Sequence, residues 1–393
     1  MVLRPAAAGR PRFDIGDIVR QHRATLEAQR PLTLQQRRVL SAIALCRTAA
    51  LGGHVDVCRS CGHEHPAYNS CRNRPCPKCQ ALAQEKWSAA RWERLLPAAH
   101  FHVVFTLPSE LRRLTKSRPR QVYSALISAA KATLLQLGQS RLKAQLGITM
   151  VLHTWTRDLR YHPHVHAIVT AGGLSLDGQR WLPSKPKYLF PVKVMGKLFA
   201  GKMIAELRGL HRAGVFGRLD WDKQNKFASV ISKVARKSWV VYVKKPFRRV
   251  DHVMAYLGRY THRVAIANSR LVNVSEDAVT FRTKNGKTVT LPPVTFLARL
   301  VQHVLPDGFH KIRHCGLYSS AHARAQGKLH TARQLLASNV PEPVEANLST
   351  NYEDQLHQLT GRDVTRCIRC GGPLYRVLVT ATRPPPNPVR MAA

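Results

Sequence analysis

The stretch Tyr161-His162-Pro163-His164-Val165-His166 decides how this sequence is interpreted, because it sets histidines at alternate positions ahead of an apolar run. Side chains alternate between the two faces of a β-strand, so His164 and His166 face the same way, with His162 roughly in line before Pro163. Two imidazoles on one strand, joined by a third ligand from elsewhere, can hold a divalent ion and leave coordination positions open. The stretch therefore predicts a strand that carries a metal centre.

The segments around this stretch alternate between strand-like and helix-like patterns. Strands are expected at residues 101–107, 149–154 and 164–170, and helices at residues 33–51, 82–96, 121–137 and 296–305. Asn285-Gly286 is a strong hairpin signal and divides residues 278–291 into two further strands. His102 and His153 lie on other predicted strands, and each is a candidate for the third ligand or for a supporting role. The mixture predicts an α+β fold.

The clustered cysteines predict a second kind of metal site. Two C-x-x-C pairs, Cys58/Cys61 and Cys76/Cys79, can together complete the four-sulfur shell that Zn²⁺ takes in structural sites. Alternative ligands lie in the loop between the pairs: Cys71, His63 and His65. A third pair, Cys367/Cys370, is half a zinc site, and the candidates to complete it are Cys315, His314 and His357, although a pair that binds nothing is an equal alternative.

The charge of the chain indicates a polyanionic partner. The 393 residues include 62 Lys and Arg against 22 Asp and Glu, a net charge of +40. Nucleic acid is the first candidate, and Arg72, Arg74 and Lys78 form a basic surface suited to phosphate. No apolar run is long enough to span a bilayer or to act as a signal peptide, so we expect no membrane partner and an intracellular, cytoplasmic protein. The G-x-x-x-x-G-K-[ST] phosphate loop is missing, so we expect no nucleotide cofactor.

Tyr256 and Tyr260 are candidate nucleophiles. On a helix that begins near Asp251 they are one turn apart on the same face. Such a pair is more often a packing contact, but basic neighbours, including Arg259 and Arg263, favour the phenolate that attack on phosphorus requires. Arg259 and Arg263 are also candidate DNA-binding residues. A phenol with a pKa of about 10 needs that help at neutral pH.

Together these motifs resemble the rolling-circle transposases of bacterial insertion sequences of the IS91 type, a two-tyrosine branch of the HUH endonucleases. The similarity runs from about residue 32 to residue 320. It is carried by Cys46-Arg47-Thr48, Leu51-Gly52-Gly53-His54, the cysteine cluster with Tyr68-Asn69-Ser70-Cys71-Arg72-Asn73-Arg74, residues 101–108, residues 162–166, residues 256–260 and residues 296–318. Pro75 departs from the pattern, where a histidine is expected, and this puts a mixed Cys/His zinc site in doubt.

The resemblance implies a fold, a division of the chain and a mechanism. It implies an HUH-type catalytic domain with a central antiparallel sheet and packed helices, preceded by a small zinc-binding module. The expected divisions are a basic flexible tail (1–31), a zinc-binding domain (32–97), a catalytic domain (98–300) and a basic C-terminal region with a cysteine pair and a disordered tail (301–393).

In the implied mechanism, His164 and His166, with His162 in line, bind Mg²⁺ or Mn²⁺. Tyr256 or Tyr260 attacks single-stranded DNA at an element end, which gives a 5′-phosphotyrosine and a free 3′-OH. Work on DNA also implies association with the bacterial nucleoid. The oligomeric state is not predicted.

Three other classes remain as alternatives. A plasmid-type replication initiator or relaxase shares the histidine and tyrosine chemistry but differs at the zinc module. A non-catalytic zinc-ribbon nucleic-acid binder would leave the histidine strand and tyrosine pair without a role. A tyrosine recombinase activates phosphate with arginines and needs no metal.

Overall fold

The computed structural model describes residues 11–92, 94–217, 226–247, 252–253, 265–319, 323–337, 351, 353–354, 356–357 and 363–382. Within these residues, none of the helices has the length and apolar character needed to cross a membrane.

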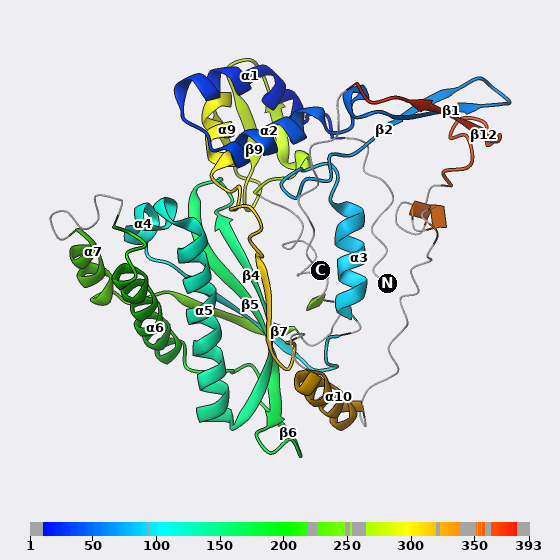
Figure 1. Cartoon of the computed structure of the whole chain (residues 1–393). Helices are drawn as coiled ribbons and strands as arrows, with labels where there is room; N and C mark the ends of the chain where they lie inside the picture. Colours follow the sequence, from blue (N-terminus) through cyan, green and yellow to red (C-terminus); the bar gives the residue numbers. More distant parts are fainter. Residues whose placement is uncertain are drawn as a thin grey trace.

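A central antiparallel sheet organises the middle of the chain (Figure 1). Its strands, in spatial order, are β11 (Ile312–Gly316), β4 (Ala144–Trp155), β5 (Tyr161–Ser175), β3 (His100–Thr106) and β7 (Val241–Phe247), and the short β6 (Trp181–Pro183) pairs with β5. The strands expected at 101–107, 149–154 and 164–170 are confirmed as β3, β4 and β5, and β4 and β5 extend further at both ends than their patterns predicted. The expected antiparallel sheet in an α+β fold is therefore confirmed.

Helices cover one face of this sheet and bury the largest core (Figure 1). They are α4 (Arg112–Ser117), α5 (Pro119–Leu137), α6 (Val192–Arg212) and α7 (Lys226–Ala235). Val165, Ala167 and Val169 of β5 belong to this core, so the odd-numbered residues of that strand face the helices. The even-numbered residues, including all three histidines, face the opposite side.

That opposite side holds a smaller core. Val151 of β4 and Ile168 of β5 pack there with Leu329 of α10 (Ala323–Ala337) and with Val253, one of two described helical residues between 248 and 264. α3 (Ala81–Trp92) also lies on this side (Figure 1). The sheet is thus covered by helices on both faces, and the histidines sit on the less densely covered face.

A second unit has its own core and brings together distant parts of the chain (Figure 1). It comprises α1 (Ile15–Gln29), α2 (Leu34–Leu45), the sheet β8 (Leu271–Val274), β9 (Val279–Arg282) and β10 (Thr288–Leu291), and α9 (Pro293–Val301). The hairpin expected around Asn285-Gly286 is confirmed as β9–β10, with positive φ angles of 56° and 76° at these two residues.

The residues expected to form a flexible tail, 1–31, include α1. Asp14 caps this helix by accepting a hydrogen bond from the Gly16 N–H at 2.9 Å. Ile15, Ile18 and Leu26 are fully buried, because their helical spacing puts them on one apolar face of α1. The basic composition of this part of the chain gives no sign of that face.

The division expected at residue 300 also differs from the structure. Residues 265–301 pack against α1 and α2, while β11, beyond residue 300, pairs with β4 of the central sheet. The two units are therefore interleaved along the chain.

A third, small sheet joins two ends of the described chain. β1 (Gly53–Cys58) lies between β2 (Glu64–Tyr68) and β12 (Leu374–Val379), and both pairings are antiparallel. Asp56 and Arg376 face each other in this register and form an ion pair at 2.8 Å. The region expected as a basic C-terminal extension thus contributes a strand to the N-terminal module.

Candidate functional site

Three histidines converge on the less densely covered face of the central sheet. β5 presents His164 and His166, and the pairing register sets His153 of β4 directly opposite His164. Each of the three offers a ring nitrogen, and these nitrogens all lie within 4.8 Å of one another. This spacing suits a single cation held by three imidazoles, with further coordination positions open.

His162 lies beside this group but does not belong to it among the described residues. Its ring centroid is 5.4 Å from that of His164. Its backbone carbonyl accepts a hydrogen bond from His164 Nδ1 at 2.6 Å, which requires the proton on Nδ1 and leaves a lone pair on Nε2 of His164. The sequence analysis predicted His162 as a ligand. In the structure its backbone orients His164, and the third converging ring nitrogen comes from His153.

His102 supports the group from β3. Its Nε2 lies 2.7 Å from His166 Nδ1, and the two rings are stacked with centroids 5.0 Å apart. A partner on the second ring nitrogen fixes the orientation and tautomer of a metal-binding histidine. Of the two roles considered for His102, the geometry matches the supporting one.

Burial keeps these imidazoles neutral. It lowers the pKa of His164 to about 4 and that of His166 well below its usual range. The pKa of His102 falls to about 3 for the same reason, with the positive charge of Lys244 on β7 as the next cause. Neutral imidazoles keep the lone pairs that can bind metals, so His164 and His166 retain theirs at neutral pH.

The candidate nucleophiles lie outside the described residues. They are Tyr256 and Tyr260. The same holds for their basic neighbours Arg259 and Arg263. Val253, three positions before Tyr256, is completely buried in the core that contains Val151 and Ile168.

The cysteines form two clusters in place of the expected single site. The first contains Cys46, Cys71, Cys76 and Cys79, and the second contains Cys58, Cys61, Cys367 and Cys370; within each, the sulfurs lie within 4.8 Å of one another. The structure does not bring Cys58 and Cys61 together with Cys76 and Cys79. The reason is the β1–β12 pairing, which supplies the first pair with a partner pair from far along the chain.

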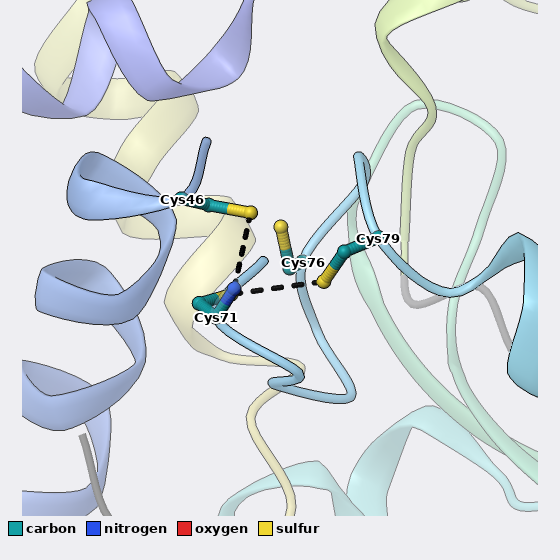
Figure 2. Close-up of side chains that lie close together, drawn as sticks. All are labelled: Cys46, Cys71, Cys76 and Cys79. Carbon is teal, nitrogen blue, oxygen red and sulfur yellow. Dashed lines mark hydrogen bonds between the residues drawn. The ribbon is translucent and has the colours of Figure 1, made fainter. Parts of the chain in front are cut away.

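Figure 2 shows the first cluster, in which Cys46 follows the end of α2 and points toward the sulfurs of the loop. The Cys71 N–H donates to Cys46 Sγ at 3.4 Å, and Cys71 Sγ lies 3.7 Å from Cys79 Sγ. Hydrogen bonding with Cys46 is the largest cause that lowers the pKa of Cys79 and raises the pKa values of Cys71 and Cys76. Hydrogen bonding with Cys71 is in turn the largest cause that lowers the pKa of Cys46. Thiolate charge is thus favoured on Cys46 and Cys79, and such charge would attract a cation.

Sequence reasoning did not assign Cys46 to a metal site, because it has no C-x-x-C partner. The one signal was its place in the Cys46-Arg47-Thr48 motif. His63, His65, His314, His357 and Cys315, considered as alternative ligands, belong to neither cluster among the described residues.

The three basic residues near the first cluster differ in availability. Arg72 is exposed. Lys78 Nζ pairs with Asp14 Oδ2 at 2.5 Å and so ties the cysteine loop to the start of α1. Arg74 is half-buried and donates to the Phe309 carbonyl at 3.4 Å, and burial lowers its pKa. Arg72 is therefore the one of the three best placed to contact phosphate.

Two family models match the chain, and both describe transposases. Residues 18–107 match a family described as "Transposase zinc-binding domain", and residues 147–326 match one described as "Putative transposase". The first match contains the Cys46 cluster, and the second contains all three histidines of the sheet centre. The fold and the sites thus define a transposase with a zinc-binding domain.

Two curated relatives extend over most of the chain. The chain is 40% identical over 373 residues to "Putative transposase y4qJ" of Sinorhizobium fredii, covering 91% of this chain and 92% of the relative. It is 28% identical over 359 residues to the transposase for insertion sequence element IS801 of Pseudomonas savastanoi pv. phaseolicola, covering 86% and 81%. No solved structure matches. The chain belongs to the IS91-type transposases of insertion sequences.

Proposed function

We propose that this transposase cuts and rejoins single-stranded DNA at the ends of its insertion sequence, with His153, His164 and His166 holding a divalent ion and Tyr256 or Tyr260 acting as nucleophile. The observation that carries the proposal is the convergence of three histidine ring nitrogens on one sheet face. The IS801 transposase, named for an insertion sequence, is a relative over most of the chain.

The residues of the chain meet what such a centre requires. The carbonyl of His162 orients His164 through Nδ1, and His102 orients His166 through its Nδ1, so both can bind through Nε2. Mg²⁺ or Mn²⁺ in this position supplies a Lewis acid that polarises the scissile phosphate. Lys244, exposed on β7 opposite His102, adds a positive charge beside the site for the DNA backbone.

The tyrosine step needs no external energy source, because one phosphoester bond replaces another. The phenol oxygen forms a bond to phosphorus and loses its proton to solvent or a nearby base, and the bond to the 3′ oxygen breaks and releases a 3′-OH. The resulting 5′-phosphotyrosine conserves the energy of the cleaved phosphodiester bond for rejoining. The second tyrosine can accept the strand during transfer. Val253, three positions before Tyr256 in sequence, packs on the histidine face of the sheet, and this supports the assignment.

The experiment that tests the proposal traps the covalent intermediate. The purified protein is incubated with Mn²⁺ and a single-stranded oligonucleotide that carries an element end, and the adduct is resolved on a denaturing gel. We expect an adduct with wild type and with the exposed-histidine control His330→Ala, and none with His153→Ala or with Tyr256→Phe combined with Tyr260→Phe. An adduct that survives EDTA, or that persists in the double tyrosine variant, would rule the mechanism out.

The Cys46 cluster is the assignment that we favour for the structural zinc of the zinc-binding domain. All four of its cysteines lie within residues 18–107, and Cys46, Cys71 and Cys76 are buried in the core shared with α1, α2 and α9. Metal here would tie the cysteine loop to α2. Cys76→Ser should therefore lower both the zinc content and the thermal midpoint of the protein, whereas Cys315→Ser, at a buried cysteine outside both clusters, should leave the zinc content unchanged.

A further inference from the structure

We propose that Cys58, Cys61, Cys367 and Cys370 bind a second zinc ion and form a zinc ribbon whose two halves come from opposite ends of the described chain. The four sulfurs lie within 4.8 Å of one another, with Cys58 Sγ 3.4 Å from Cys370 Sγ and Cys61 Sγ 3.8 Å from Cys367 Sγ. The matched zinc-binding family ends at residue 107 and so contains only half of this site.

The two halves have the same local structure. Each is a C-x-x-C-G turn, in which the glycine has positive φ, 68° at Gly62 and 73° at Gly371. In each, the glycine N–H donates to the carbonyl of the first cysteine, at 3.0 Å for Gly62 to Cys58 and 2.9 Å for Gly371 to Cys367. This matched pair of turns presents two sulfurs from each side, which is the arrangement a tetrahedral four-thiolate site requires.

Backbone contacts lock the two turns together. The Arg59 N–H donates to the Pro373 carbonyl at 3.1 Å. A Cβ added to Gly372 would lie 2.4 Å from Ser60 Oγ and 2.8 Å from Ser60 Cβ, so a glycine is required where the second turn approaches the first. The Arg369 N–H approaches Cys367 Sγ at 3.4 Å, a contact that would stabilise thiolate charge.

The strands next to the two turns, β1 and β12, also pair with each other. Cys58 ends β1 and pairs with Leu374 at the start of β12, so both turns lie at the same end of the three-stranded sheet. Arg376 pairs with Asp56, and Arg59 lies over the Tyr375 ring at 5.7 Å. This sheet buries little apolar surface: Tyr375, Val377 and Leu378 are all exposed. A sheet with so small a core depends on metal binding for much of its stability.

Zinc counting tests the site directly. Protein prepared with zinc and a reductant is freed of loose metal, and its zinc content per chain is measured by mass spectrometry. We expect Cys58→Ser/Cys61→Ser, Cys367→Ser/Cys370→Ser and the quadruple variant each to hold one zinc fewer than wild type. Cys315→Ser is the matched control and should hold the wild-type number. These comparisons are differences from wild type, so they do not depend on the Cys46 cluster or on the nuclease proposal.

Two further measurements cover the alternatives. Deuterium exchange at residues 374–379 should accelerate at least about tenfold in Cys58→Ser/Cys61→Ser, because loss of the metal at one end of the chain frees the strand from the other. Alkylation of denatured wild-type protein without reductant should modify all nine cysteines. Unchanged zinc in either double variant, a quadruple variant that loses two zinc ions, unchanged exchange, or two disulfides in place of free thiols would each overturn the proposal.

Discussion

His102 Nε2 and His166 Nδ1 lie 2.7 Å apart on adjacent strands, β3 and β5. The contact orients His166 through a residue that faces the same side of the sheet. In the metal centre proposed above, His102 would act through His166, as a positioning residue.

The first prediction separates this positioning role from a structural one. His102→Leu removes the acceptor for His166 and should weaken Mn²⁺ binding about 10- to 100-fold, the usual cost of losing such an outer partner. His102→Gln can still accept the hydrogen bond and should retain more of the affinity. Calorimetric titration with Mn²⁺ measures both. The control is His100→Gln, at a buried histidine of the same strand that bonds to Tyr318 instead, which should keep wild-type affinity. Equal losses in all three variants would indicate a folding effect only.

The second prediction concerns which histidine is the third ligand. His153→Ala should abolish measurable Mn²⁺ binding, because it removes one of the three converging nitrogens. His162→Ala keeps the backbone carbonyl that orients His164 and should leave affinity nearly unchanged. The same titration compares the two variants. The reverse result would return His162 to the ligand set that the sequence suggested.

The third prediction is a pH dependence of stability at Lys311. Its side chain is buried, Nζ has no hydrogen-bond partner among the described residues, and burial followed by the charge of Arg74 lowers its pKa to about 7. Between this value and the ordinary lysine pKa, the unfolded chain binds the proton more readily than the folded one, so this residue makes folding less favourable as pH falls through that window. The cost is fully present below about pH 7, and each tenfold difference in proton affinity between the folded and unfolded chains corresponds to about 1.4 kcal/mol.

Lys311→Met should therefore raise the thermal midpoint at pH 7, and the gain over wild type should shrink as pH rises toward 10. Melting curves at several pH values provide the measurement. Lys287→Met, at an exposed lysine, is the control and should show no such trend. A gain that is the same at every pH would mean that folding does not lower the pKa of Lys311.

The fourth prediction concerns the end of β11. Gly316 has φ +61°, and a Cβ there would lie 1.9 Å from the Leu146 carbonyl oxygen. Backbone strain alone costs about 1–3 kcal/mol, and Gly316→Ala should destabilise the fold by more than this because of the added clash. Gly308→Ala has a similar φ, and its Cβ would meet only a guanidinium nitrogen of Arg120 at 4.0 Å, so it should show the strain cost only. Gly201→Ala, exposed within α6, should stabilise by about 0.5–1 kcal/mol. Denaturant titration ranks the three, and a Gly316→Ala loss no larger than that of Gly308→Ala would contradict the clash.

The sequence predicted the elements whose information is local. The strand at 101–107 and the hairpin at Asn285-Gly286 are set by short apolar runs and by turn residues, and both are confirmed. The helix α1 was missed, because its apolar positions were grouped with the arginines around them as one basic tail. Its burial against α9, contributed by residues nearly three hundred positions later, cannot be read from the segment itself.

The sites show the same distinction. The alternation that sets His164 and His166 on one face is a property of a single strand, so the sequence shows it. The choice of His153 over His162 depends on the register of β4 against β5, which is a tertiary fact. The cysteine grouping likewise depends on which strands pair: C-x-x-C spacing identifies pairs of ligands, but only the β1–β12 register assigns Cys58 and Cys61 to Cys367 and Cys370.

The β1–β12 pairing also sets an order of events during synthesis. Cys58 precedes Cys367 by 309 positions (367 − 58), so at about 5–20 residues per second the ribosome needs roughly 15 to 60 s to supply the second turn after the first. Throughout that interval β1 has only β2 beside it. A nascent chain released before Cys367 would carry the histidine strand but would leave one edge of β1 open to solvent, so this small sheet assembles among the last parts of the molecule.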